Sequence, residues 1–185
     1  MNLSLYSIQA FIVLDTEGNR VLAKYYRSKS NPQGETKDFQ HLKEQKTFEK
    51  GLWGKTKKPG GDIILYDSHL VVYKHSLDLI LYFVASPHEN EIMLSHALTC
   101  LTDALTMLLR NSLEKRGVLE NLDLILLCLD ETIDDGIIVD TDATAIASRV
   151  TRPRADSTEI IINEQSIMTA YQTMKDRLQQ GLRGT

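Results

Sequence analysis

The order and spacing of the apolar runs constrain the fold of this chain more than any other feature. Two runs of β-branched and aromatic residues, 5–14 and 21–26, lie on either side of the turn-forming cluster 15–19. Three further runs follow with two or three residues between neighbours: 63–66, 70–74 and 77–85. Parallel neighbours need a crossover of about a dozen residues or more, so these short links permit only antiparallel pairing. The sequence therefore predicts a hairpin followed by a three-stranded antiparallel meander.

One charged segment, residues 36–53, lies between the hairpin and the meander. It is rich in helix formers and places apolar side chains, Phe39 and Phe48 among them, at imperfect helical spacing. This pattern predicts an amphipathic helix with most of its surface exposed, and Gly51 and Gly54 weaken its end.

The second half of the chain has mainly helical periodicity. Ser86 is the predicted N-cap of a long helix, with Pro87 at the first helical position and Glu89 completing a capping box. Apolar residues from Met93 to Leu109 repeat on more than one side of that helix, which predicts that it is buried. Three shorter elements are expected beyond it: a helix over 118–133, a strand over 137–139, and a helix capped by Asp142 that runs through Val150.

The element order gives the fold class and the domain organisation. It has no βαβ alternation, so an α+β fold is expected, with a five-stranded antiparallel sheet packed by helices and extra C-terminal helices. This is the longin layout, and residues 1–150 are the predicted longin-like domain. Residues 151–185 are predicted to form a linker and a C-terminal amphipathic helix over 164–180. The apolar seam of that helix suits docking on one neighbour, either this domain or another chain: Ile167, Tyr171, Met174 and Leu178.

Composition and charge exclude several classes of function. The formal net charge is −4 and the basic residues are spread along the chain, so no nucleic-acid surface is expected. Only Lys55, Lys57 and Lys58 cluster, either as a solvated turn or as a weak supporting contact with an anionic membrane. The N-terminus lacks the pattern of a secretory signal and the apolar runs are too short to span a bilayer, so membrane attachment is expected only through other proteins. Cys100 and Cys128 lie in apolar segments and are predicted to be buried, reduced thiols.

No residue pattern supports catalysis, a cofactor or a metal. Gly54-Lys55-Thr56 resembles the end of a phosphate-binding loop, but Glu49 occupies the position where that motif requires glycine. Carboxylates also occur at Asp130-Glu131 and Asp134-Asp135. We interpret them as the polar residues of a helix end and not as a catalytic acid/base pair. The five histidines lack the spacing of metal ligands: His41, His69, His75, His88 and His96. The sequence therefore predicts a protein that is not an enzyme, with no catalytic, cofactor or metal residues.

A set of short motifs, in order along nearly the whole chain, resembles the zeta subunits of the COPI coatomer. They are Ala23-Lys24-Tyr25-Tyr26, Glu44-Gln45-Lys46, Phe48-Glu49-Lys50, Val71-Val72-Tyr73-Lys74, Glu89-Asn90-Glu91, Met93-Leu94, Cys100-Leu101, Asp103, Leu108-Leu109-Arg110, Glu114-Lys115-Arg116, Leu119-Glu120-Asn121 and Leu129-Asp130-Glu131. The segment 27–42 departs from the family because it is longer than the usual link.

The resemblance implies a non-catalytic subunit of a vesicle coat. It implies direct binding to the large gamma subunit, with beta and delta subunits in the same adaptor-like subcomplex and recruitment to membranes through an Arf GTPase. It implies a cytoplasmic protein, peripheral to Golgi membranes and COPI vesicles, that serves retrograde Golgi-to-ER and intra-Golgi transport.

Two alternatives share the fold: a sigma-type subunit of a clathrin adaptor, and a longin-type regulator of a small GTPase or of a SNARE. The predicted partner interface comprises the seam of the C-terminal helix together with Phe48, Leu52 and Trp53. The sequence leaves open whether Trp53, with its two apolar neighbours, folds into the core or forms an exposed anchor.

Overall fold

A computed structural model describes residues 7–26, 39, 41–58, 62–110 and 112–151. Its centre is one five-stranded sheet in the order β2-β1-β5-β4-β3, in which every neighbouring pair is antiparallel. The strands are β1 (Ile8–Asp15), β2 (Arg20–Tyr25), β3 (Ile63–Tyr66), β4 (His69–Ser76) and β5 (Leu79–Ala85). The predicted hairpin and meander are therefore confirmed.

The sheet is buried on both faces, as the near-continuous apolar composition of its central strands requires. Phe11 of β1 lies opposite Phe83 of β5, and their rings meet edge to face with centroids 5.6 Å apart on one face. The next residues along the two strands, Ile12 and Tyr82, are also opposite each other and face the other way. All four side chains are fully buried.

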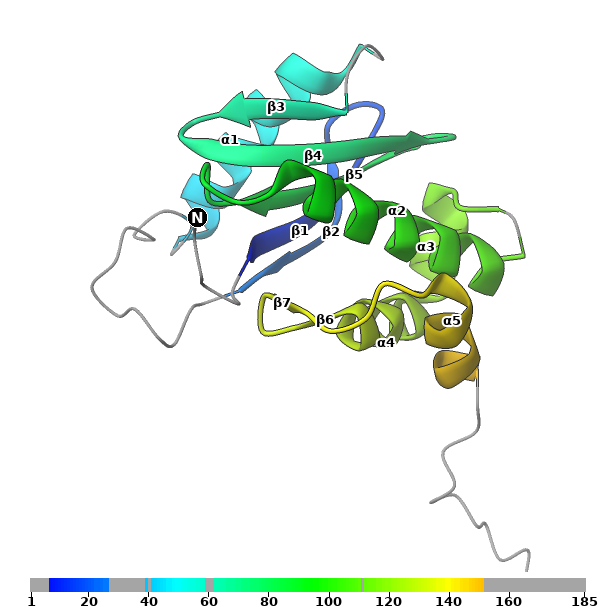
Figure 1. The fold of residues 1–185 in the computed structure, drawn as a ribbon. Helices are drawn as coiled ribbons and strands as arrows, with labels where there is room; N and C mark the ends of the chain where they lie inside the picture. Colours follow the sequence, from blue (N-terminus) through cyan, green and yellow to red (C-terminus); the bar gives the residue numbers. More distant parts are fainter. Residues whose placement is uncertain (1–6, 27–38, 40, 59–61, 111, 152–185) are drawn as a thin grey trace, which may run out of the picture. The chain divides into compact units, whose positions relative to one another are not determined.

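Helices cover the two faces unequally (Figure 1). One face packs against a single helix, and the other packs against a long helix with two more helices stacked on it. The single helix is α1 (Leu42–Thr56). The long helix is α2 (Glu91–Leu108), and the two stacked on it are α4 (Leu122–Thr132) and α5 (Ala143–Thr151). The short helix α3 (Lys115–Glu120) comes directly before α4. A short hairpin joins α4 to α5. Its strands, β6 (Ile133–Asp134) and β7 (Ile137–Ile138), are two residues long each. The predicted α+β class is confirmed.

The start of α2 corrects the predicted N-cap. Ser86 does not cap the helix, because its carbonyl accepts from the amide of Glu89 in a turn that carries the chain away from β5. Asn90 is the cap, and its side-chain oxygen accepts from the amides of Ile92 at 3.0 Å and Met93 at 3.2 Å. One asparagine thus satisfies two of the free amides at the helix start.

The cap predicted for the last described helix is confirmed. The Asp142 carboxylate accepts from the amides of Thr144 and Ala145, at 3.0 and 3.1 Å. The helix predicted over 118–133 is instead divided at Asn121, whose backbone leaves the helical region between α3 and α4.

Two apolar residues predicted in regular elements lie in turns. Leu77 was expected in a strand, but it has φ of +44° between β4 and β5 and is 76 % exposed. Phe39 was expected in the first helix, but it precedes α1 with φ of +76° and packs against the rings of Tyr25, Phe48 and His69.

The helix α1 continues through both glycines that were expected to weaken it. Gly51 permits a close approach, because a Cβ atom there would lie 1.9 Å from the Tyr66 hydroxyl oxygen. The last residue, Thr56, is buried and its hydroxyl lies 2.7 Å from the Tyr82 hydroxyl. This hydrogen bond fixes the end of α1 to the middle of the sheet.

The chain divides into two compact units, Met1–Arg152 and Pro153–Thr185. The second unit lies outside the described residues. The predicted linker and C-terminal helix therefore stay predictions.

Candidate partner interface

The β2 edge of the sheet is tied to α1 by a buried polar cluster. The Glu49 side chain is only 4 % exposed, and its carboxylate accepts from Arg20 Nη2 at 2.6 Å and Arg20 Nε at 2.8 Å. The Tyr25 hydroxyl donates to the same carboxylate at 2.7 Å. Burial, reinforced by the bond to Glu49, raises the pKa of Tyr25 far above its usual value, so the hydroxyl keeps its proton as donor.

The opposite side of β2 is tied to α4. Lys24 forms an ion pair with Asp130, and its ammonium nitrogen lies 5.3 Å from the centre of the Tyr26 ring. Burial is the largest cause of the raised pKa of Tyr26, and the nearby carboxylates, Asp130 first among them, add to it. The β2 edge is therefore held from both faces of the sheet.

One end of the sheet is anchored by a second buried carboxylate. Burial alone would raise the pKa of Asp15, but hydrogen bonds from Lys115 Nζ and from Asn19 and Glu17 outweigh it and lower that pKa to about 2. The amide of Lys115 also donates to the Asp78 carboxylate at 2.9 Å. Both strand turns at this end are thus fastened to the start of α3.

The β3 edge differs, because it exposes apolar side chains. Leu65 is 72 % exposed and Ile63 is 42 % exposed. Their cross-strand partners in β4, Leu70 and Val72, belong to the cluster under α2, so the exposed pair lies on the α2 face of the sheet. Ile92, in the first turn of α2, is 75 % exposed. Contiguous exposed apolar side chains mark surfaces that interact with proteins or membranes.

The three α1 residues of the predicted interface lie close together. Two of them are in the protein interior and the third is half-buried. Phe48 is 5 % exposed and Leu52 is fully buried, so both fill the core of this chain and leave almost no side-chain surface for a partner. Trp53 is half-buried: its ring packs on Gly18 and lies 5.3 Å from the Lys57 ammonium. The other predicted interface residues, Ile167, Tyr171, Met174 and Leu178, lie outside the described residues.

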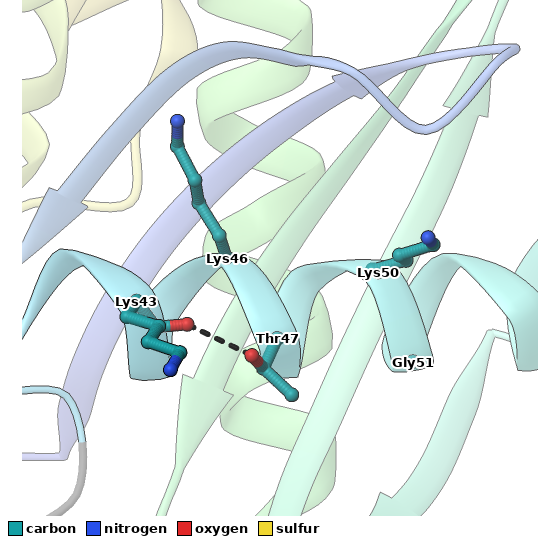
Figure 2. A pocket seen from close by; sticks show the side chains of 5 residues that line it. All are labelled: Lys43, Lys46, Thr47, Lys50 and Gly51. Atoms are coloured by element: carbon teal, nitrogen blue, oxygen red, sulfur yellow. Dashed lines mark hydrogen bonds between the residues drawn. The ribbon is translucent and has the colours of Figure 1, made fainter.

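The exposed side of α1 carries a row of lysines that the sequence interpretation did not single out. Lys43, Lys46 and Lys50 line a shallow hollow of about 500 Å³ together with Thr47 and Gly51 (Figure 2). The spacing i, i+3, i+7 places the three lysines on one helical face and is the signal that could have found them. We call these three residues the lysine face of α1.

The side chains that could bind a metal or act as nucleophiles are either far apart or buried in the described part of the chain. Within the described residues, no three side chains of the His, Cys, Asp and Glu types come close enough to hold a metal ion. Burial raises the pKa of Cys100 to about 11 and that of Cys128 to about 12, and both thiols are free and buried as predicted. His96 is exposed on α2. Among the described helices, none is both long and apolar enough to cross a bilayer.

Comparisons with known proteins agree with this arrangement. The family described as "Clathrin adaptor complex small chain" matches residues 7–157. The coatomer subunit zeta of Saccharomyces cerevisiae is 40 % identical over 187 residues, with 98 % of this chain and 99 % of that protein covered. Coatomer subunit zeta-1 of Homo sapiens is 36 % identical, with 97 % of this chain and 94 % of that protein covered.

A structural comparison agrees on the fold. A chain of the "full-length AP-3 complex in a stretched open conformation", a homology model, matches with a TM-score of 0.57 and 13 % identity. The match covers 92 % of this chain and 98 % of the other. From the fold, the family match and the identity over nearly its full length, this chain belongs to the coatomer zeta subunits within the clathrin adaptor small-chain family.

Proposed function

We propose that this chain is the non-catalytic small subunit of a COPI-type vesicle coat. The observation that carries the proposal is its similarity, over nearly the full length, to proteins named as zeta subunits of coatomer. The proposal includes direct binding to a large gamma-type subunit, with beta and delta subunits in the same subcomplex. It also includes a cytoplasmic location, Arf-dependent recruitment to Golgi membranes, and retrograde Golgi-to-ER and intra-Golgi transport.

The exposed apolar side chains of the β3 edge, together with Ile92 of α2, are the proposed contact with the large subunit. Leu65 and Ile92 are among the most exposed large apolar residues in the described part of the chain. A stable subunit interface buries on the order of 2,000 Å² or more and has an apolar centre, and these side chains supply such a centre. The C-terminal helix, with its seam from Ile167 to Leu178, is the second proposed element of the interface.

Native purification tests the proposal directly. The full chain, tagged and purified from cytosol, is expected to bring down a gamma-type large subunit and the other coatomer chains in near-equal amounts by mass spectrometry. Recovery of a clathrin-adaptor set would keep the fold and change the pathway. A lone monomer would remove the coat function.

A pair of matched double variants tests the contact surface. Leu65→Asp with Ile92→Asp should abolish recovery of the large subunit, because two charges would enter an apolar interface. Leu77→Asp with Val139→Asp is the control, since those residues are 76 % and 61 % exposed and lie outside the β3 edge. Equal recovery with both double variants would exclude the β3 edge as the contact.

A further inference from the structure

We propose that the lysine face of α1, formed by Lys43, Lys46 and Lys50, is a contact surface for an anionic lipid membrane. The three side chains are exposed, and none has an ion pair within the part of the chain that the structure describes. Their charges are therefore available to an external anion.

The acidic residues of α1 leave this face cationic. Glu49 points into the core, where its carboxylate is engaged by Arg20 and Tyr25. Glu44 accepts from the amide of His41 at the start of the helix. Glu44 is therefore the one exposed carboxylate of α1, against three exposed lysines of the lysine face, although the chain as a whole has a net charge of −4. Lys55 and Lys58 are also exposed and extend the charge to the end of the helix and just beyond it.

The lysines spread apart instead of converging on one point. Figure 2 shows the side chains of Lys43 and Lys46 pointing away from each other, with Lys50 a turn further along. The Thr47 hydroxyl donates to the Lys43 carbonyl oxygen at 2.8 Å and is thereby directed back to the helix. A site for a single phosphate needs converging donors. A spread row of free ammonium groups fits the distributed charge of an anionic bilayer, where each lysine near the surface adds to the attraction.

The position of α1 allows membrane contact and partner binding at the same time. α1 covers one face of the sheet, whereas Ile63 and Leu65 point to the face covered by α2. The α1 helix is held rigidly by the Glu49 cluster and by the bond between Thr56 and Tyr82. The choice of a lipid surface over an acidic protein rests on the proposed coat function, because a coat subunit works within reach of a bilayer.

Vesicle sedimentation with the purified full chain tests this proposal. We expect binding to phosphatidylcholine vesicles that contain phosphatidylserine, little binding to pure phosphatidylcholine vesicles, and loss of binding as salt is raised. The triple variant Lys43→Gln, Lys46→Gln, Lys50→Gln should bind roughly 100-fold more weakly, from about five-fold for each lysine.

A matched triple variant separates the lysine face from net charge. Lys74→Gln, Arg110→Gln and Arg116→Gln remove the same number of positive charges from exposed or partly exposed positions outside α1 and should reduce binding only slightly. Unchanged melting temperatures for both triple variants would show that folding is intact.

Three results would overturn the proposal: no binding of the unmodified chain to anionic vesicles at low salt, equal losses in the two triple variants, or an α1 variant that binds vesicles normally but loses a coat partner. The last result would assign the lysine face to an acidic protein. Because the vesicle assay uses the purified chain alone, the first two results are independent of whether coat subunits co-purify.

Discussion

The two edges of the sheet are built in opposite ways. The β2 edge is fastened to α1 through Glu49 and to α4 through Asp130, so ionic contacts hold it from both faces. Within the described residues, β3 makes neither an ion pair nor a side-chain hydrogen bond, and it exposes Ile63 and Leu65. An exposed strand edge with apolar side chains is an aggregation hazard unless something covers it. The β2 edge is thus covered by contacts within this chain, whereas the β3 edge exposes the apolar side chains for which we propose a partner.

The largest expected effect comes from opening the β2 edge at Glu49. Glu49→Ala leaves the Arg20 guanidinium and the Tyr25 hydroxyl without their shared acceptor. Removing one member of a buried ion pair costs about 3 kcal/mol of unfolding free energy, and we expect a loss of that order in urea denaturation. Lys50→Ala on the exposed side of the same helix is the control and should change the unfolding free energy by less than about 0.5 kcal/mol. Similar losses in both variants would contradict a special role for the cluster.

The second effect concerns the anchored end of the sheet and depends on pH. The pKa of Asp15 is lowered from 3.8 to about 2 in the folded protein, so its contribution is fully present above pH 3.8 and is lost as the pH falls towards 2. At neutral pH the contribution is up to about 2 kcal/mol, since Lys115 is partly exposed and solvent screens the pair.

Acid denaturation of Asp15→Asn checks this expectation. The variant should be less stable than the unmodified chain at neutral pH, and the difference should vanish between about pH 4 and pH 2. Asp123→Asn, an exposed carboxylate on α4 without a described ion pair, is the control. A stability difference that persists unchanged to pH 2 would show that the ionised carboxylate is not the cause.

The third effect tests the other tether of the β2 edge. Lys24 and Asp130 are 35 % and 56 % exposed, so solvent weakens their attraction. Lys24→Gln is expected to cost no more than about 0.5 kcal/mol in the same denaturation assay. A loss as large as that of Glu49→Ala would mean that the α4 side, and not the α1 side, holds β2 in place.

Much of the fold could be predicted because it rests on local signals. Short links between apolar runs determine the antiparallel order, and the periodicity after Met93 identifies the helix α2. Competing local signals were harder to rank: Ser86 and Asn90 are both good caps, and the turn after β5 decides between them.

The candidate surfaces were less predictable because they depend on contacts between distant parts of the chain. The pairing of Arg20 with Glu49 joins residues 29 positions apart and leaves no pattern in the sequence. Phe48 and Leu52 could not be assigned to core or surface until α1 was placed on the sheet. The lysine face was the exception, because its helical spacing is visible in the sequence alone.

The smallest expected change in stability is at the β3 edge, where Leu65 is 72 % exposed. Leu65→Ser removes little buried surface, so the unfolding free energy should change by less than about 0.5 kcal/mol. The same variant should weaken recovery of the large subunit in native purification, because the side chain would lie in the apolar centre of the interface. Leu77→Ser, at a similarly exposed turn, should leave both measurements unchanged. If Leu65→Ser instead destabilises the isolated chain as much as Glu49→Ala does, the β3 edge is completed within this chain, and the contrast between a closed and an open edge is wrong.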